Sequence, residues 1–325
     1  MARRFISGAF LAAASCACAS FAQAAEPQSA HQVRELKITV LSTMLADAGI
    51  GEWGYAALVE VDGKRILFDT GARPETVLAN AREMRIELAD IEEVVLSHNH
   101  DDHTGGLVTL RRELRKQNPR ALSKAHVGEG IFLPRTAPNG AERNGLLRFK
   151  SEYESMGGTF IVHSKPTQLL PGVWITGPVP RVHPEKNYPQ GLKLKSPSGE
   201  IADTIPEDSS LVIHTTEGLV VLAGCGHAGI INTIDHARAS IASQPVVAVI
   251  GGLHTFSASD EVLAWTADKM KAAGLRYFLA GHCTGIEAAF RIRQLAGLDR
   301  KTAVVSSVGS SFTLGKGIDP GAIAR

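Results

Sequence analysis

The sequence predicts an α/β fold in which two β-sheets pack face to face and helices cover their outer sides, an αββα layering. The first observation is the order of segments: apolar runs of strand length precede helical runs, and this order recurs in the second half. The second is that clusters of histidine and glycine directly follow predicted strands. The third is the composition, with 325 residues of which 44% are hydrophobic and 21% charged, which suits one large globular domain.

The first half of the chain opens with strands. Two apolar runs flank Asp62-Gly63, a pair typical of a tight hairpin turn. Pro74 opens a helical stretch, because proline is favoured in the first turn of a helix. We expect strands at 36–41, 55–61, 64–68 and 91–96, and helices at 74–84 and 107–116.

The middle of the chain, about 118–207, contains eleven of the fifteen prolines. We expect a loop-rich insert there with short strands, bordering the functional site. Regular periodicity returns at Ser210. The remaining strands are predicted at 211–215, 219–223, 246–250, 277–280 and 303–306, and the remaining helices at 230–241, 261–273 and 286–295.

The first 24 residues have the pattern of a secretory signal peptide. Arg3 and Arg4 precede a run of small and apolar residues, and Ala22-Gln23-Ala24 is a small-x-small cleavage site. The run is too short and too rich in Ala, Ser and Cys to predict a membrane-spanning helix. We therefore predict cleavage after residue 24, export to the periplasm or medium, no stable membrane anchor, and a single mature domain at 25–325.

Charge and cysteine content limit the classes of partner. The formal net charge is +1, so there is no broad basic surface for nucleic acid, and we expect a small-molecule substrate. After cleavage only Cys225 and Cys283 remain, both beside histidines. Two cysteines cannot replace a hydrophobic core, so site chemistry is the favoured interpretation, with one disulfide as the alternative.

The strongest chemical signal is His-x-His-x-Asp-His, which consists of His98, His100, Asp102 and His103 and follows a buried strand. Imidazole and carboxylate are the ligands that a divalent ion such as zinc prefers. In an extended segment His98 and His100 point the same way, because side chains alternate with a period of two. The following turn brings Asp102 and His103 to a second position. The motif predicts binding of one or two divalent metal ions, and the ligand chemistry favours zinc.

These motifs resemble those of the metallo-β-lactamase superfamily. The resemblance extends over nearly all of the mature chain and includes Asp69-Thr70-Gly71 after a strand and the histidine motif itself. Three further motifs are similar to the branch that includes the dihydropterin-ribofuranosylaminobenzene-phosphate synthases: Gly224-Cys225-Gly226-His227-Ala228-Gly229, Gly251-Gly252-Leu253-His254 and Gly281-His282-Cys283-Thr284-Gly285.

The resemblance implies a set of metal ligands. His98, His100 and His227 would hold a first metal, and Asp102, His103 and His282 a second. The sequence departs from the larger family after Gly224, where most members carry an aspartate that bridges the metals and this chain has Cys225. Cys225 then either supplies a thiolate ligand or only packs. Asp208 is the other candidate carboxylate, and the number of metals stays open.

Two further residues have candidate roles. The resemblance implies that Asp69 orients the histidine segment from behind, whereas a turn-forming aspartate is the alternative. His254 follows a strand and a glycine pair, so it either faces the substrate as a binding group or acid, or is structural.

The function that these features favour is metal-assisted hydrolysis of an ester, amide or phosphoester by an activated water. Asp102 would hold or accept the proton of that water. One alternative is a transferase similar to the pterin-condensing synthases, which export argues against. The other is a non-enzymatic metal or redox sensor in which Cys225 and Cys283 oxidise.

Overall fold

The fold begins with an antiparallel meander whose strands are rich in β-branched residues. The structure is a computed structural model that describes residues 1–2 and 31–324. The predicted leader therefore lies almost entirely outside the described residues. Strands β1 (Leu36–Ser42), β2 (Ala56–Val61) and β3 (Lys64–Phe68) pair antiparallel in sequence order. Asp62 and Gly63 both have positive φ at the β2–β3 turn, as the Asp-Gly pair predicts.

The first sheet has eight strands in the order β18-β17-β1-β2-β3-β4-β5-β7. Strands β4 (Glu93–Leu96), β5 (Lys124–Gly128) and β7 (Thr159–His163) extend the meander in parallel from β3. Short strands β17 (Ser311–Thr313) and β18 (Gly317–Asp319) close the other edge. The helices of this half are α1 (Thr76–Glu83), α2 (Asp101–Thr104), α3 (Leu107–Leu114) and α4 (Leu146–Ser155).

The second sheet has seven strands in the order β16-β15-β14-β13-β12-β9-β8. Its strands are β8 (Thr167–Leu170), β9 (Val173–Ile175), β12 (Leu211–Thr215), β13 (Gly218–Ala223), β14 (Val246–Gly251), β15 (Tyr277–Ala280) and β16 (Ala303–Val305). Helices α5 (Ile230–Ser240), α6 (Asp260–Ala272) and α7 (Ile286–Ala296) and the short 3₁₀ helix η1 (His282–Thr284) follow strands of this sheet.

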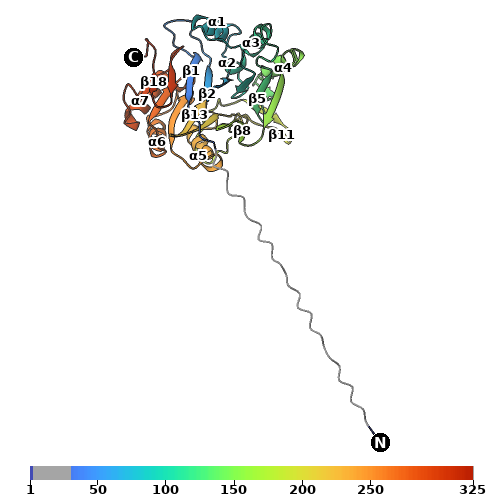
Figure 1. The fold of residues 1–325 in the computed structure, drawn as a ribbon. Helices are drawn as coiled ribbons and strands as arrows, with labels where there is room; N and C mark the ends of the chain where they lie inside the picture. Colours follow the sequence, from blue (N-terminus) through green and yellow to red (C-terminus); the bar gives the residue numbers. More distant parts are fainter. Residues whose placement is uncertain (3–30, 325) are drawn as a thin grey trace. The chain divides into compact units, whose positions relative to one another are not determined.

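Three apolar clusters define the layers and confirm the predicted αββα fold. One lies between the two sheets and includes Ile38, Phe68 and Leu222. A second joins the outer face of the first sheet to α1 and α3, and a third joins the outer face of the second sheet to α5, α6 and α7. Figure 1 shows α1 and α3 on one side of the strands and α5 and α6 on the other. Burial of this apolar surface is the main force that holds the layers together.

The stretch 118–207 is more regular than its prolines predict. Its first part contains β5, α4 and β7, which continue the first sheet, and β8 and β9 belong to the second. The rest of the stretch leaves the two main sheets and is called the excursion below. In it β6 (Arg135–Thr136), β10 (Lys193–Ser196) and β11 (Gly199–Ala202) form a separate small sheet. Prolines fall in the connections between these strands, so a high proline count did not mean absence of sheet. Strands β17 and β18 were missed because three-residue strands carry almost no periodic signal.

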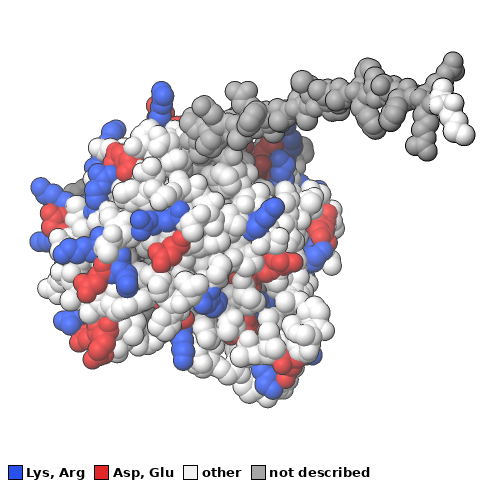
Figure 2. All heavy atoms as spheres, turned by 90° about the horizontal axis from the view of Figure 1, so that it is seen from below, with Lys and Arg blue, Asp and Glu red and all other residues white. Residues whose placement is uncertain are grey.

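The surface carries charges of both signs. Figure 2 shows Lys and Arg interspersed with Asp and Glu over the face in view, with no large area of one sign. Among the described residues, no helix is both long and apolar enough to span a bilayer.

Candidate metal centre

The histidine motif leaves the carboxyl end of β4 and enters a short helix. His98 follows the strand closely, and His100 is the N-cap of α2 with extended backbone dihedrals. His98 and His103 are fully buried. The rings of His98 and His100 lie 4.5 Å apart between centroids, so the period of two does bring them to one side.

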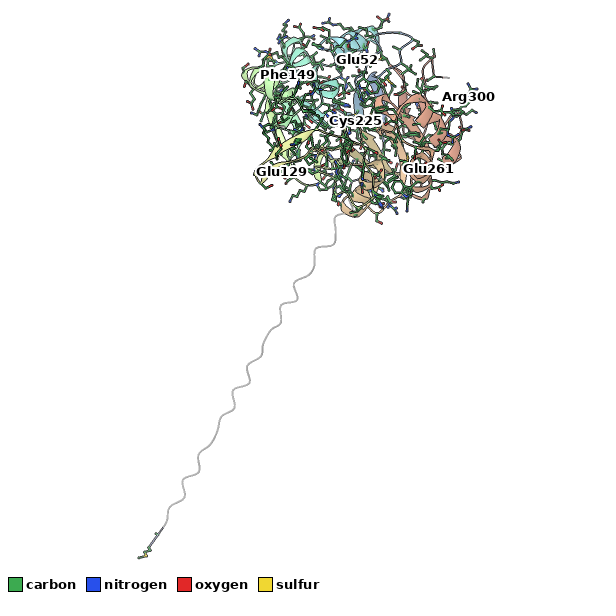
Figure 3. The ribbon with its side chains drawn as sticks, turned by 180° about the vertical axis from the view of Figure 1, so that it is seen from behind. Glu52, Glu129, Phe149, Cys225, Glu261 and Arg300 are labelled. Carbon is green, nitrogen blue, oxygen red and sulfur yellow. The ribbon has the colours of Figure 1, made fainter. Side chains whose placement is uncertain are left out.

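Seven of the residues named from the sequence converge at this point. They form overlapping groups whose ligand atoms lie within 4.8 Å of one another: Asp102, His103, Cys225 and His282; His98, Cys225 and His227; and His98, His100 and Asp102. Figure 3 shows Cys225 near the middle of the domain, whereas Arg300, Phe149 and Glu129 lie toward its periphery. The ends of β4, β13 and β15 therefore meet at one centre.

The group that contains Asp102, His103, Cys225 and His282 has the spacing of a four-ligand metal site. His103 Nε2 lies 3.1 Å from Cys225 Sγ and 3.3 Å from His282 Nε2, and His282 Nε2 lies 3.1 Å from an Asp102 carboxylate oxygen. Zn–N and Zn–S bonds of about 2.0–2.3 Å in a tetrahedron place neighbouring ligand atoms about 3.3–3.7 Å apart. The Cys225 sulfur belongs to this group, to the group with His98 and His227, and to a further one with His254 and Cys283, so it lies between the two predicted metal positions.

Two orphaned nitrogens show that the other group also suits a metal. His98 Nε2 and His227 Nε2 are buried and have no hydrogen-bond partner among the described residues. Their Nδ1 atoms are held, that of His98 by the Ser97 hydroxyl at 2.9 Å and that of His227 by the Asn187 carbonyl. A metal-ligating imidazole typically has one ring nitrogen held by a hydrogen bond and the other free to bind the metal. His98 and His227 both have this arrangement, and their ligand atoms lie within 4.8 Å of each other.

Asp69 lies directly behind the histidine segment. Its carboxylate accepts hydrogen bonds from the Ser97 amide at 2.7 Å, the Ser97 hydroxyl at 2.8 Å and His103 Nδ1 at 2.7 Å. It is fully buried and has a φ of +55°, a conformation in which Asp is tolerated better than most residues. Asp69 thus both ends β3 and orients two members of the metal centre.

The two cysteines are free thiols and both are buried. Cys283 Sγ accepts from the His254 amide at 3.3 Å and donates to the Cys225 carbonyl oxygen at 3.7 Å. The alternative of a disulfide is not what the structure contains. Cys225 is placed to be a ligand, and Cys283 lies beside it on the cavity lining, in a further candidate ligand group with Cys225 and His254.

Asp208 supports the site from outside the ligand groups. One carboxylate oxygen accepts from the Ala228 amide at 2.8 Å, which steadies the turn that carries His227. Burial raises the pKa of Asp208 to about 7. Asp208 is outside the groups of clustered ligand atoms, and its other carboxylate oxygen is buried without a hydrogen-bond partner among the described residues.

His254 lies at the edge of the centre, with its ring centroid 4.5 Å from that of His227. Its φ of +50° is uncommon for a residue other than glycine, and its Nδ1 is buried without a partner among the described residues. It also lines the adjoining cavity, so its position suits contact with a substrate.

A cavity of about 1070 Å³ opens onto the metal centre. Asp102, Cys225 and His282 form its floor, and its walls include Trp53, Phe256, Trp265, Tyr188 and the segment Pro184–Gln190. The ring centroid of Trp53 lies 4.9 Å from that of His282 and 6.0 Å from that of Phe256. A pocket of this size with an aromatic wall and a polar floor is typical of a small-molecule site.

Sequence reasoning missed the residues of this wall. Trp53 is carried on a loop that Glu52 holds, since its buried carboxylate accepts from the Ser42 hydroxyl at 2.8 Å and from the Ala72 amide at 2.9 Å. Nothing in the local pattern distinguishes Trp53 or Phe256 from an ordinary surface aromatic. The six remaining histidines lie outside the ligand groups: His31, His126, His163, His183, His214 and His236.

The protonation equilibria differ between the two groups. Burial lowers the pKa of His98 and His227, and it lowers that of His100 to about 3. Burial acts the same way on His103, but the carboxylates of Asp69 and Asp102 outweigh it and raise its pKa to about 9. The first group, His98, His100 and His227, is thus neutral at pH 7, whereas His103 of the second group, which also contains Asp102, Cys225 and His282, carries a proton that a metal must displace.

Metal affinity at the second group should therefore rise with pH. In a His98→Ala variant, which leaves the second group intact, we expect apparent affinity to increase by at least about tenfold per pH unit between about 6.5 and 9, because metal displaces the His103 proton and also the thiol proton of Cys225, whose pKa burial raises. In a His282→Ala variant, which leaves the first group intact, affinity should change little over the same range. Chelator-competition titrations measure both, and equal slopes in the two variants would contradict the assignment.

Comparison with known proteins agrees with this geometry. Residues 54–239 match the model of the metallo-β-lactamase superfamily. The 7,8-dihydropterin-6-methyl-4-(beta-D-ribofuranosyl)-aminobenzene-5'-phosphate synthase of Methanocaldococcus jannaschii is 31% identical over 268 residues, which are 79% of this chain and 90% of the relative. An uncharacterized protein of the same organism is 28% identical over 242 residues, 74% of this chain and 88% of the relative.

Solved structures show the same fold. Tm1679, a metal-dependent hydrolase of the beta-lactamase superfamily, superposes with a TM-score of 0.69 at 23% identity, covering 85% of this chain and 98% of that one. Zinc-bound PqqB of Methylobacterium extorquens gives a TM-score of 0.52 at 14% identity, covering 85% and 99%. With the family model matching more than half of the chain, this protein belongs to the metallo-β-lactamase superfamily.

Proposed function

We propose that this protein is an exported metal-dependent hydrolase that acts on a small molecule with an ester, amide or phosphoester bond. The proposal rests on the buried Nε2 atoms of His98 and His227, which have no hydrogen-bond partner within the described part of the chain. They lie beside the group of Asp102, His103, Cys225 and His282, at the floor of a cavity. His98, His100 and His227 would hold one divalent metal, and Asp102, His103 and His282 with Cys225 a second.

A divalent metal, zinc by the chemistry of these ligands, would lower the pKa of a bound water and polarise a substrate oxygen. The chain's own residues do the rest. Asp102 faces both the cavity and His282, so its free oxygen is placed to hold or accept a proton from water. Burial opposes ionisation of Asp102, but neighbouring histidines outweigh burial and hold its pKa well below the usual range, so Asp102 stays ionised and any proton that it accepts from water is passed on readily. His254, on the cavity wall, is placed to bind or protonate the leaving group.

Export is the second part of the proposal. It rests on the charged start, apolar run and Ala22-Gln23-Ala24 cleavage site. Expression of the full chain followed by N-terminal sequencing tests it. A mature N-terminus at or near Ala25 in the periplasmic fraction supports export, whereas an intact leader in the cytoplasm contradicts it.

A transferase of the pterin-condensing type is the second candidate, and the 31% identity to the M. jannaschii synthase favours it. The aromatic wall formed by Trp53, Phe256 and Trp265 suits a substrate that carries flat rings. The transferase would use the same metal centre as the proposed hydrolase, but it would join two substrates where the hydrolase cleaves one with water.

The experiment is a metal-dependent activity assay on purified mature protein. Metal content is measured by elemental mass spectrometry, and activity is assayed on a panel of ester, amide and phosphoester substrates and on a dihydropterin condensation reaction. Hydrolysis that disappears with a chelator and returns with zinc supports the proposal. Condensation alone would establish the rival, and a protein that stays metal-free after metal supplementation would contradict both.

A further inference from the structure

Three imidazoles of the metal centre, those of His98, His103 and His227, have a hydrogen-bond partner at Nδ1, and these partners come from two different parts of the fold. His98 and His103 obtain their Nδ1 partners from within the core, through Ser97 and Asp69. His227 obtains its partner from the backbone carbonyl of Asn187, which lies on the excursion between β9 and β10. One side of the metal centre therefore depends on a segment that is not part of either main sheet.

That segment, Arg181–Gln190, is anchored to the turn that carries His227. The Glu185 carboxylate accepts from the Ile231 amide at 3.1 Å and the Asn232 amide at 2.8 Å, at the start of α5. These are amides that the first helical turn leaves without an intrahelical acceptor, so they favour the carboxylate, although burial outweighs them and raises the pKa of Glu185. Gly229 makes room for it, because a Cβ at Gly229 would lie 2.2 Å from a Glu185 oxygen.

Further contacts fix the segment on both sides of Asn187. Its side-chain amide donates to the Leu253 carbonyl at 3.1 Å, next to His254. The Arg181 guanidinium donates to the His227 carbonyl and lies over the Tyr188 ring, 5.4 Å from its centroid. The backbone carbonyl of Asn187 is thus held at a defined place by anchors before it, at it and after it.

We propose that Glu185 and Asn187 are positioning residues for His227, and that the segment Arg181–Gln190 sets the geometry of the first metal group. The inference rests on the metal centre of the proposed function and deepens it. Neither Glu185 nor Asn187 belongs to the groups of candidate metal ligands. Glu185 acts by fixing the segment, the segment places the Asn187 carbonyl, and that carbonyl holds the Nδ1 proton so that Nε2 faces the metal. Partners of this kind are typically worth about 10–100-fold in metal affinity.

The first readout needs no metal. A hydrogen-bonded imidazole Nδ1 proton gives a resolved, exchange-protected downfield proton resonance, which a His227→Ala variant assigns. In metal-free Glu185→Ala we expect this resonance to exchange faster or disappear. In Glu185→Gln, whose amide oxygen still accepts one of the two α5 amides, it should be partly retained. A surface variant of the same excursion, Glu200→Ala, should leave it unchanged.

The second readout is the pair of metal dissociation constants from chelator competition. In Glu185→Ala and in Asn187→Ala, we expect affinity of the first group to fall about 10-fold or more, with the second group changed less than about threefold. Loss of both affinities together with the melting temperature would show a merely structural role and overturn the proposal. An unchanged Nδ1 resonance in Glu185→Ala would also overturn it. Because this resonance is measured without metal or substrate, failure of the hydrolase assay would not alter what it shows about His227.

Discussion

The Asp69→Ala variant is expected to bind metal about 10–100-fold more weakly than the parent and to be less stable. The side chain makes three short hydrogen bonds, two to Ser97 and one to His103, and all three donors are buried. Each buried donor left without an acceptor costs roughly 1–3 kcal/mol. The released His103 ring would lose its fixed orientation, and without the Asp69 carboxylate its pKa would no longer be held at about 9.

Two variants separate these contributions. Asp69→Asn keeps one oxygen for the Ser97 amide and tolerates the positive φ, so its affinity and stability should lie between those of the parent and the alanine variant. Asp62→Ala is the matched control, because Asp62 also has a positive φ and its carboxylate also accepts from backbone N–H groups and a histidine, but at an exposed turn.

Metal affinity is measured by chelator competition, and stability by urea unfolding of the metal-free proteins. If Asp69→Ala loses stability while its metal affinity stays within about threefold of the parent, Asp69 is only a structural turn residue. Asp62→Ala should lose some stability and no metal affinity.

The Arg135→Met variant is expected to lose about 3–5 kcal/mol of unfolding free energy, the usual cost of stranding a buried charge. Arg135 is 1% exposed, and its guanidinium donates to Asp203 at 3.0 Å and to Glu207 at 2.5 Å. Burial raises the pKa of Glu207 to about 7 in spite of the arginine, so removal of Arg135 leaves two carboxyl groups in an apolar setting. The segment that they occupy leads directly to Asp208.

The lost unfolding free energy should be recovered when Arg135, Asp203 and Glu207 are all replaced together. Well-packed apolar residues in place of a buried ionic network are often neutral or stabilising, so Arg135→Met with Asp203→Leu and Glu207→Leu should regain most of the lost free energy. The surface pair of Arg276 and Glu217 supplies the control, because Arg276→Met should cost no more than about 1 kcal/mol. Urea denaturation midpoints at constant m-value measure all three, and a loss below about 1 kcal/mol in Arg135→Met would contradict the prediction.

The sequence by itself determined the layering and the histidine set. Strands such as β4, β13 and β14 are short, apolar and bounded by glycine or polar residues, so their local pattern was sufficient. Because the chemistry-bearing motifs directly follow these strands, their convergence could be expected once two sheets were predicted. His98, His100, Asp102 and His103 are also close in sequence, which makes their mutual geometry a local matter.

Only the tertiary structure decided which groups complete the centre. Cys225 was left between ligand and packing residue, and the 3.1 Å approach of its sulfur to His103, 122 residues away, comes from the packing of β13 against the first sheet. Asp208 was a candidate ligand by sequence and turned out to hold the Ala228 amide.

The cavity wall could not be predicted for the same reason. Trp53, Phe256 and the segment Arg181–Gln190 have no periodic or motif signal, and they meet only because loops from both halves are drawn to the same end of the two sheets. Secondary-structure propensity depends on residues that are neighbours in the sequence, whereas a cavity wall built from distant loops depends on how the layers pack. The sequence therefore specified the candidate metal ligands, and tertiary packing determined what holds His227 in place and which residues line the cavity.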